Sequence, residues 1–442
     1  MKKNLKNGTG QKLWKKAKQL IPGGNQLLSK RAEMFLPEEW PAYYSKAKGV
    51  YVWDLDGKKY LDMSIMGIGN CLLGYGDKDV DSAVKKIIDK GVMATLNAPE
   101  EVELAELLIK LHPWAEMARY ARTGGEAMAM AVRIARAYTG RDTIAFCGYH
   151  GWSDWYLSAN LADDKTLDGH LLPGLEPRGV PRGLKGTLIP FHFNDIKELE
   201  EAVKIAGQDL AAIVLEPVKG KPPTPEFIEK VRLLANTSGA VLLADEITAG
   251  FKFAKGGSHL AYGLVPDLAV FSKAMANGYA MAAVIGKKEV MEAAQTTFIS
   301  STNWTERIGP TAALVTIKKL VKRDTAGQLA KVGKRVKQVW ATASKKYGIP
   351  LTIAGSDTIT SFSFSGTEAQ ALKTLFIQEM LDQGILASTL FFGTLAHTDA
   401  HVKQYEKAVN KAFAILKKAI DTNTVNKCLR GPITHSGFAR LN

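Results

Sequence analysis

The chain has 442 residues, of which 46 % are hydrophobic and 23 % are charged, and these proportions exclude an intrinsically disordered or collagen-like protein. Its 58 basic and 44 acidic residues give a formal net charge of +14, which would suit nucleic acid, an anionic surface or an acidic substrate. The length predicts two unequal domains. The widely spaced Cys71, Cys147 and Cys428 form neither a disulfide framework nor a zinc site, so no metal is expected.

The sequence contains no expected targeting signal or membrane span. Residues 1–20 are basic but lack the apolar core of a signal peptide, and no stretch approaches the ~18 apolar residues of a membrane helix. Together with the unpaired cysteines, these features predict a cytoplasmic protein that has no membrane partner.

The lysines gather in residues 2–18 and 318–346. In the second segment, apolar residues recur at three- and four-residue spacing, so the lysines are interpreted as the solvated face of a helix. A nucleic-acid-binding protein is the alternative, but no nucleic-acid motif is present and aromatic residues are not interleaved with the basic runs. We therefore expect no nucleic-acid partner.

The N-terminal part of the chain predicts a short helix and then a small antiparallel sheet. Pro22-Gly23-Gly24 ends the helix. Two β-rich runs follow on either side of Asp56-Gly57, a residue pair that suits a tight hairpin turn. The helix is marked by an apolar stripe of Leu13, Trp14, Ala17, Leu20 and Ile21.

From about residue 75, short apolar runs alternate mostly with longer helical or loop stretches. Runs without polar alternation are typical of parallel strands that are covered on both faces, so we expect an α/β domain with a mainly parallel central sheet. The runs lie at residues 143–148, 211–216, 240–246, 268–273 and 281–286.

After about residue 310 the pattern changes to helical periods, short strands near 352–356 and 360–366, and a last helix near 402–420. This change predicts a second, smaller α+β domain. The expected organisation is an N-terminal arm and hairpin at 1–74 that packs with the small domain, a large domain at 75–315, and a small C-terminal domain at 316–442.

Polar residues close several of the apolar runs: Glu216, Asp245 and Lys273. In parallel sheets, ligands bind beyond the carboxyl ends of the strands, which makes these residues the first candidates for a site. Gly124 and Gly125 precede a strong helical stretch, so they lie at a helix N-terminus, where free N–H groups attract phosphate.

These three features match the parts of a pyridoxal phosphate (PLP) site. Such a site needs a lysine that forms a Schiff base, a carboxylate that holds the pyridine nitrogen protonated, and a phosphate-binding group. Each feature also has a structural alternative: a plain turn for the glycines, a helix cap for Asp245 and a surface lysine for Lys273.

Several motifs carry a resemblance to a known family. The segments TGGEAMAMAVRIARAYTGRD, FCGYHGW, VLEPVKG, LLADEITAGFK and FSKAMANGYAMAAVIG, in this order and spacing, resemble class III aminotransferases, most closely the glutamate-1-semialdehyde aminomutase branch. The likeness covers nearly the whole chain, from LWKKAKQLIPGG to LAHTDAHVKQYEKA. It implies a PLP-dependent transferase fold of type I, PLP as cofactor, and a small-molecule amino donor and carbonyl acceptor as substrates.

The resemblance implies roles for individual residues. Lys273 corresponds to the Schiff-base lysine and Asp245 to the partner of the pyridine nitrogen, and these two are the expected catalytic residues. Tyr149 corresponds to the aromatic residue stacked on the cofactor ring, and Ile247 to the branched residue under its other face. Glu216 corresponds to a family glutamate near the substrate.

The resemblance also implies how the cofactor phosphate is held. Thr123, Gly124 and Gly125 stand where the family has Ser-Gly-Thr, so position 125 lacks a hydroxyl and offers backbone contacts only. The family sends a threonine from the neighbouring subunit to the phosphate, five residues before a proline, and Thr305 precedes Pro310 at that spacing. A homodimer with shared active sites follows; the alternative is that Thr305 caps a helix beginning near Gly309.

Departures from the family pattern bear on the substrate. Arg122, Trp152 and the segment 302–307 depart from the family pattern. Arg122 and Trp152 are expected substrate contacts together with Glu216, and the segment 302–307 is expected to reshape the substrate side. We therefore expect an aminotransferase that moves an amino group between two molecules, with a polar or sugar-derived acceptor. The alternative is intramolecular transfer of the glutamate-1-semialdehyde 2,1-aminomutase type, which would use the same catalytic residues.

Overall fold

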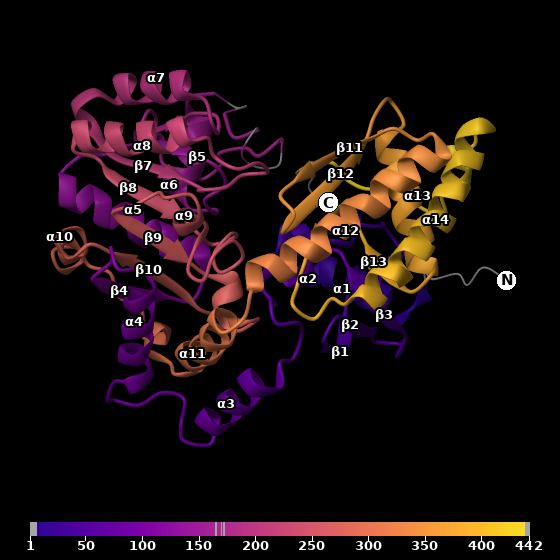
Figure 1. The fold of residues 1–442 in the computed structure, drawn as a ribbon, viewed down its shortest axis with the longest axis horizontal. Helices are drawn as coiled ribbons and strands as arrows, with labels where there is room; N and C mark the ends of the chain where they lie inside the picture. The colour runs from indigo at the N-terminus through magenta and orange to yellow at the C-terminus, as the bar shows by residue number, and fades with distance from the viewer. Residues whose placement is uncertain (1–6, 164–165, 169, 171–172, 438–442) are drawn as a thin grey trace. The chain divides into compact units, whose positions relative to one another are not determined.

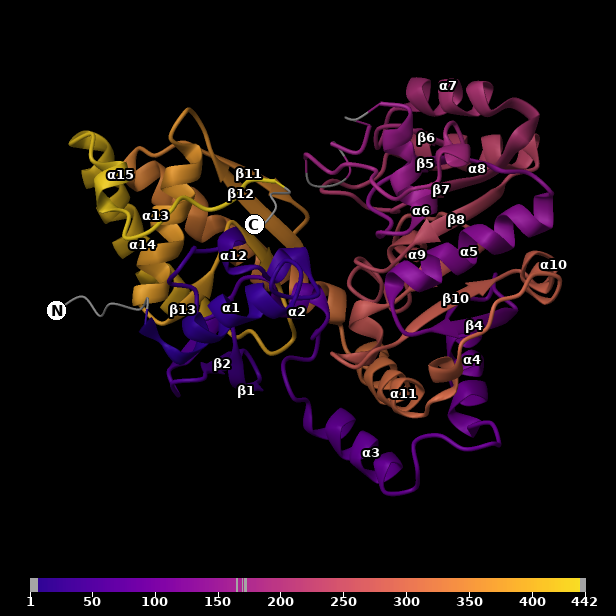
Figure 2. The ribbon, with the colours of Figure 1, turned by 180° about the vertical axis from the view of Figure 1, so that it is seen from behind.

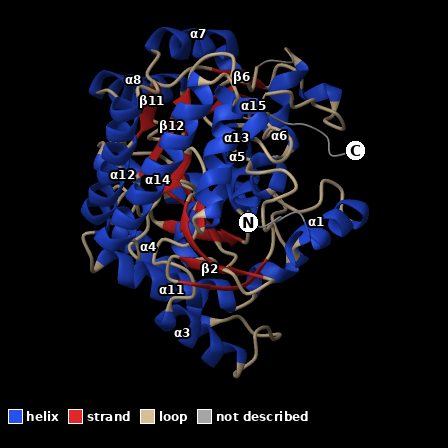
Figure 3. Cartoon of the chain, turned by 90° about the vertical axis from the view of Figure 1, so that its right-hand side faces the viewer, coloured by secondary structure: helices blue, strands red, loops and turns tan. Residues whose placement is uncertain are grey.

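The computed structural model describes residues 7–163, 166–168, 170 and 173–437 (Figure 1). By their contacts the residues divide into two compact units, one of residues 1–77 and 327–442 and the other of residues 78–326. Both units combine helices, blue in Figure 3, with strands, shown in red. Among the described residues, no helix is both long enough and apolar enough to cross a membrane.

The unit of residues 78–326 is built on a seven-stranded sheet with the strand order β4-β10-β9-β8-β7-β5-β6. Strand β10 pairs antiparallel with both of its neighbours, and the pairs from β9 to β6 are parallel. The expected α/β fold with a mainly parallel sheet is confirmed. The strands are β4 (Met117–Ala121), β5 (Thr143–Cys147), β6 (Leu188–Pro190), β7 (Leu210–Leu215), β8 (Val241–Asp245), β9 (Leu268–Phe271) and β10 (Ala282–Gly286).

Each predicted apolar run contains a strand, but the last one does not run parallel as the pattern suggested. Only residues 272–281 separate β9 from β10, whereas a parallel crossover needs a dozen or more residues, so the chain turns back and β10 is antiparallel. Two strands of this sheet, β4 and β6, were not predicted. Most of β4 is only partly buried and β6 has 3 residues, so neither forms a continuous apolar run.

Helices cover both faces of this sheet (Figure 1 and Figure 2). Val214 and Leu243 pack with α5, whereas their strand neighbours Ile213 and Leu242 pack with α7 and α8. Because successive strand residues point to opposite faces, both must be apolar when both faces are covered, and the runs therefore lack polar alternation. The covering helices are α5 (Gly124–Thr139), α7 (Ile196–Ala206) and α8 (Pro225–Ser238).

Helix α11 closes this unit by packing against α3 and α4. It continues without a break to Val321, and residues 316–326, which the sequence assigned to the small domain, make their contacts within the larger unit. The remaining helices here are α3 (Lys78–Ile88), α4 (Pro99–Leu111), α6 (Asp154–Leu157), α9 (Ser258–Ala261), α10 (Lys288–Met291) and α11 (Ile308–Val321).

The other unit contains two sheets, with the orders β1-β2-β3-β13 and β11-β12-β14. The predicted hairpin is confirmed, because β2 and β3 pair antiparallel across the Asp56-Gly57 turn. Strand β13, from the C-terminal part of the chain, pairs parallel with β3. The strands are β1 (Tyr44–Lys48), β2 (Tyr51–Asp54), β3 (Lys59–Met63), β11 (Leu351–Gly355), β12 (Ile359–Phe364), β13 (Ile385–Ala387) and β14 (Leu390–Phe392).

Two helices predicted in this unit, the N-terminal helix and the lysine-rich helix, are confirmed as α1 and α12. In α12, Val336 and Trp340 are buried while Lys331 and Lys334 are exposed, as the apolar spacing predicted. Residues 1–6 of the predicted N-terminal arm lie outside the described residues. The helices are α1 (Thr9–Leu20), α2 (Met66–Gly69), α12 (Thr325–Tyr347), whose first two residues belong to the larger unit, α13 (Ala369–Asp382), α14 (Asp399–Asp421) and α15 (Val425–Cys428).

Candidate active site

The residues that close the apolar runs meet at one edge of the seven-stranded sheet. Glu216 follows β7, Asp245 ends β8, and Lys273 comes two residues after β9. These strands are neighbours in the sheet and run parallel, so their carboxyl ends lie side by side. The loop after β5, which carries Tyr149, reaches the same edge, where open α/β sheets bind ligands.

Asp245 is the most heavily bonded of these residues and is only 3 % exposed. Its Oδ1 accepts a hydrogen bond from the amide of Ile247 at 2.9 Å, and its Oδ2 lies 2.8 Å from Nδ1 of His150. The other ring nitrogen of His150 donates to the Cys147 carbonyl oxygen at 3.1 Å, because a carbonyl can only accept. A buried carboxylate thus has a partner for each oxygen.

Sequence analysis did not single out His150. Its signal was its place in the FCGYHGW segment, where it follows a strand end by a few residues and stands next to Tyr149. The histidine is 1 % exposed, and the ring of Trp155 stacks on it at 6.2 Å between centroids. Its role is to position the Asp245 carboxylate and to tie the loop after β5 to the end of β8.

Lys273 has a strained backbone. It is the first residue of the 3₁₀ helix η7 (Lys273–Ala276), and its φ of 44° lies in the left-handed region that non-glycine residues seldom adopt. Its Nζ donates a hydrogen bond to Oγ1 of Thr248 at 2.8 Å. Burial lowers the pKa of the Lys273 amine, against the opposing charges of Asp245 and Glu216. A lowered pKa favours the neutral, nucleophilic amine.

A second lysine lies beside Lys273, and sequence analysis missed it. Lys252 is 1 % exposed and donates from Nζ to the main-chain carbonyl of Thr248, so the two lysines hold the two oxygen atoms of one threonine. Burial and the positive charge of Lys273 lower the pKa of Lys252 to about 7, while the Glu246 carboxylate opposes the shift. The only sequence signal was a lysine inside the mostly apolar segment 247–254.

Glu216 and Tyr149 are joined through the backbone. The amide of Tyr149 donates to Oε2 of Glu216 at 3.2 Å. Burial and the nearby Asp245 charge raise the pKa of the Glu216 carboxyl, and burial raises the pKa of the Tyr149 phenol. The Tyr149 side chain is nevertheless 43 % exposed, so one face of its ring is available to a ligand.

The helix start predicted to bind an anion is the N-terminus of α5, which begins at Gly124. Thr123 is the N-cap, and the carboxylate of Glu126 accepts from both its amide, at 2.9 Å, and its hydroxyl, at 3.0 Å. In the described part of the chain, no hydrogen bond takes the amides of Gly124 or Gly125, which belong to the first helical turn. Two free N–H groups at the positive end of a 16-residue helix fit a phosphate.

Close packing joins this helix start to Asp245. A Cβ at Gly124 would lie 2.8 Å from Cδ1 of Ile247, so a side chain at this position would displace the end of the Ile247 side chain. A Cβ at Gly125 would lie 3.1 Å from the ring of Trp152, in the loop after β5. Asp245 is thus connected to the start of α5 through Ile247 and Gly124, and the loop after β5 contacts both Asp245, through His150, and Gly125, through Trp152.

Arg122, an expected substrate contact, is bound within the chain. Its Nε lies 2.9 Å from Oε1 of Glu306, and Nη2 donates to the carbonyls of Trp304 and Glu306 at 2.8 Å each. Burial lowers the pKa of the Arg122 guanidinium, against the opposing Glu306 charge. Arg122 thus holds the segment 302–307 against the end of β4.

Thr305 is exposed and lies in the 3₁₀ helix η9 (Thr302–Thr305), where its hydroxyl donates to the Thr302 carbonyl at 3.0 Å. The alternative that it caps the following helix is wrong. Glu306 performs that role, because its carboxylate accepts from the amides of Ile308, at 2.6 Å, and Gly309, at 3.0 Å. Among the described contacts, none links Thr305 or Arg122 with Lys273.

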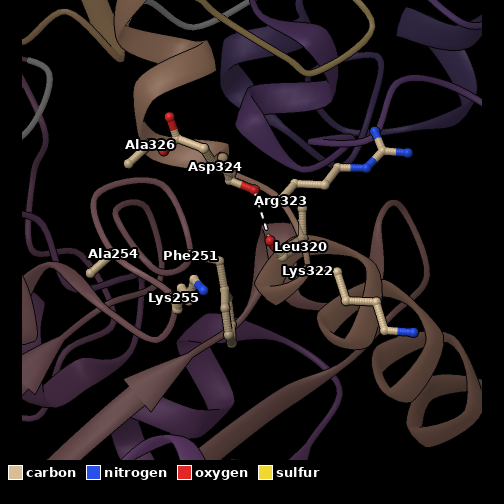
Figure 4. Close-up of a pocket in the computed structure, with 9 residues that line it drawn as sticks. Phe251, Ala254, Lys255, Leu320, Lys322, Arg323, Asp324 and Ala326 are labelled. Carbon is tan, nitrogen blue, oxygen red and sulfur yellow. Dashed lines mark hydrogen bonds between the residues drawn. The ribbon is translucent and has the colours of Figure 1, made fainter.

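A cavity of about 440 Å³ lies elsewhere in this unit, between the segment around Phe251 and the end of α11 (Figure 4). None of the predicted site residues lines it. Its rim carries Lys255, Lys322 and Arg323, but Figure 4 shows the last two side chains directed away from Phe251 rather than toward one point. The candidate site is therefore defined by the contacts at the sheet edge and not by this cavity.

The fold is the α/β fold of PLP-dependent transferase structures. A family model, Aminotransferase class-III, matches residues 36–420. The chain belongs to the class-III aminotransferase family, as the sequence motifs predicted.

Individual relatives refine this likeness. The chain is 32 % identical to the 3-aminobutyryl-CoA aminotransferase of Cloacimonas acidaminovorans, over 95 % of this chain and 100 % of that protein. It superposes with a TM-score of 0.84 and 26 % identity on the FumI protein of Sphingopyxis sp. in its PLP internal aldimine form, covering 94 % of this chain and 98 % of the other.

The resemblance to the aminomutase branch is weaker. For a glutamate-1-semialdehyde aminomutase of Pseudomonas aeruginosa the TM-score is 0.77 and the identity 18 %, over 92 % of this chain and 94 % of the other. The family prediction is confirmed. The prediction that the chain is most similar to the aminomutase branch is not supported, because its identity to this aminomutase is lower than its identity to the two relatives above.

Replacing Lys252 by methionine should flatten the pH dependence of folding stability. Between pH 7 and its ordinary pKa of 10.5, Lys252 carries a proton only in the unfolded chain. The unfolded chain then binds more protons, so the free energy of unfolding rises with pH in this window, by up to about 1.4 kcal/mol per pH unit. Denaturant unfolding across the window should give a smaller slope for Lys252→Met than for the wild type.

The matched control is Lys255→Met, the same chemical change at an exposed neighbour. Its slope should equal that of the wild type. If Lys252→Met also keeps the wild-type slope, Lys252 retains its proton in the folded chain and the buried amine is not neutral.

Proposed function

We propose that this protein is a PLP-dependent aminotransferase that moves an amino group from an amino donor to a carbonyl acceptor on a different molecule. The family supplies the reaction class and the cofactor. The observation that carries the site assignment is the meeting of Lys273 and Asp245 at the ends of adjacent strands, next to the free amides of Gly124 and Gly125.

The residues at the sheet edge fit PLP. Lys273 would hold its aldehyde carbon, Asp245 its pyridine nitrogen, and the α5 N-terminus its phosphate, while Tyr149 and Ile247 would cover the ring. When bound, PLP supplies an electron sink that stabilises negative charge on the donor carbon. The Asp245 carboxylate favours a proton on the pyridine nitrogen, and His150 keeps that carboxylate oriented.

Lys273 is the proposed general base and acid. Once the donor's amino group has replaced it on the cofactor, the Lys273 amine would be free to take a proton from the donor carbon, which requires the neutral form, and the protonated amine would then act as the acid. Burial favours that form, and the neighbouring positive charge of Lys252 would favour it further whenever Lys252 is protonated. In the chain without PLP, the Thr248 hydroxyl accepts a hydrogen bond from this amine at 2.8 Å.

We propose a donor whose amino group lies on the β-carbon of a carboxylic acid or of its coenzyme A thioester. The support is the relative that acts on 3-aminobutyryl-CoA and is 32 % identical over nearly the full length of both chains. The net charge of +14 suits an anionic substrate of this kind. Trp152 and Arg122 suggested a polar or sugar-derived acceptor. This hypothesis loses support because Arg122 is already paired with Glu306.

The aminomutase alternative differs in whether the amino group leaves the molecule. An isotopic crossover experiment separates the two: a ¹⁵N-labelled donor is incubated with an unlabelled carbonyl acceptor. We expect the label in the aminated acceptor and release of a keto product, with 3-aminobutyryl-CoA and free β-amino acids tested as donors beside α-amino acids. Strictly intramolecular transfer on glutamate semialdehyde would establish the aminomutase instead.

Borohydride reduction of the holoenzyme followed by peptide mapping should label Lys273 and leave Lys252 unmodified. Lys252 is the internal control, because it is a buried amine on the same threonine. Lys273→Ala should lower turnover by at least about 10²- to 10⁴-fold, the usual value of a general acid–base group, and should retain some cofactor at the α5 N-terminus. A label on Lys252 would refute the assignment.

We further propose a homodimer in which Thr305 of one chain contacts the phosphate held by the other. The exposed position of Thr305 supports this arrangement, since the helix cap belongs to Glu306. Lys273→Ala and Thr305→Glu homodimers should both be inactive, the second because a carboxylate would face the phosphate. A doubly tagged heterodimer of the two should regain activity at one of its sites. An inactive heterodimer, beside active wild-type mixtures, would exclude a contact across the interface.

A further inference from the structure

We propose that Trp152 binds the phosphate of PLP through its indole N–H and replaces the side-chain donor that position 125 lacks. This inference rests on the proposed function, because it concerns how this chain holds the cofactor. It assigns Trp152 to the cofactor and not, as the sequence suggested, to the substrate.

The edge of the indole ring that faces α5 is the edge that carries the nitrogen. A Cβ placed on Gly125 would lie 3.1 Å from both Nε1 and Cδ1 of Trp152. The Trp152 N–H group therefore occupies the space into which a side chain at position 125 would project. Gly125 belongs to the first turn of α5, where the free amides point.

The helix start needs such a donor because its own hydroxyl is already used. The Thr123 hydroxyl has one proton, and it donates that proton to Glu126 at 3.0 Å. Among the described residues, the remaining donors of the helix start are the amides of Gly124 and Gly125, and Nε1 of Trp152 takes part in no hydrogen bond. Hydrogen bonds from N–H groups to a charged oxygen are about twice as strong as neutral ones.

The loop that carries Trp152 is anchored to the rest of the site. Gly148 and Gly151 have φ values of 120° and 110°, which only glycine adopts readily, and a Cβ at Gly151 would lie 3.2 Å from Cα of Gly125. Between them, His150 is bonded to Asp245. The loop thus passes directly over the helix start, and its position is coupled to the residue proposed to hold the pyridine nitrogen.

The exposure of Trp152 distinguishes it from Trp155, the other tryptophan of this loop. Trp152 is 71 % exposed, whereas Trp155 is 6 % exposed and packs against His150. In the protein without ligand, a ring that is exposed and has an unbonded N–H group is available to contact a ligand. Trp155 serves packing.

The test compares the affinities of the cofactor-free protein for PLP and for pyridoxal, which lacks the phosphate. Trp152→Phe keeps an aromatic ring and removes the N–H. It should weaken PLP binding by about 10- to 100-fold, the usual effect of losing a hydrogen bond to a charged group, and leave pyridoxal binding unchanged. The ³¹P resonance of bound PLP should also shift. Tyr138→Phe, a change at an exposed aromatic residue of α5, is the control and should alter neither affinity.

Threonine at position 125 provides a second test, because its expected effect on PLP affinity has opposite signs with and without the Trp152 ring. In the wild-type background, Gly125→Thr should weaken PLP binding, since its Cβ would meet the Trp152 ring at 3.1 Å. In a Trp152→Ala background the ring is gone, so Gly125→Thr should restore PLP affinity to within a few-fold of the wild type. Circular dichroism confirms that each variant is folded before its affinities are compared.

Other outcomes overturn the proposal. Equal losses for PLP and pyridoxal in Trp152→Phe would mean that the ring contacts the pyridine or supports the loop. If Trp152→Phe leaves the PLP affinity unchanged and alters the KM for the amino donor, Trp152 contacts the substrate and not the cofactor. A wild-type protein that binds neither PLP nor pyridoxal would instead refute the proposed function itself.

Discussion

The site depends on the buried carboxylate of Asp245. A charge at 3 % exposure is tolerated only when its oxygens are bonded, and here one oxygen holds the Ile247 amide at 2.9 Å and the other holds His150 at 2.8 Å. The first bond places Ile247 against Gly124 at the start of α5. The second anchors the loop after β5. One side chain thus links the end of β8 with the two elements proposed to hold the ring and the phosphate.

Thr248 organises the amines in a similar way. Its hydroxyl accepts from Lys273 and its carbonyl from Lys252, which places two potentially positive groups in a buried region. Burial lowers the pKa of both amines, and the positive charge of Lys273 lowers the pKa of Lys252 further. The positive φ of Lys273 adds local strain that the surrounding contacts must support. The environment of Lys273 thus favours the neutral form of its amine.

Two residues expected at the substrate have structural contacts that change their interpretation. Arg122 fastens the segment 302–307 through Glu306, and Glu306 also caps α11. Trp152 lies with its N–H edge at Gly125, beside the helix start proposed to hold the phosphate. The sequence departures at 122, 125, 152 and 306 thus form two coupled pairs. Each pair joins two segments that are separate in the sequence.

The sequence by itself determined the apolar runs that became strands, the Asp56-Gly57 hairpin, the helix that begins at Gly124, and the placement of Glu216, Asp245 and Lys273 at strand ends. These follow from local patterns, because strand and helix periodicity and turn chemistry act over a few residues. Only the tertiary structure decided the antiparallel β10, the short β6, the second lysine and the His150 contact. His150 and Asp245 are 95 positions apart, and no local pattern encodes which distant side chain will fill a buried hydrogen-bonding position.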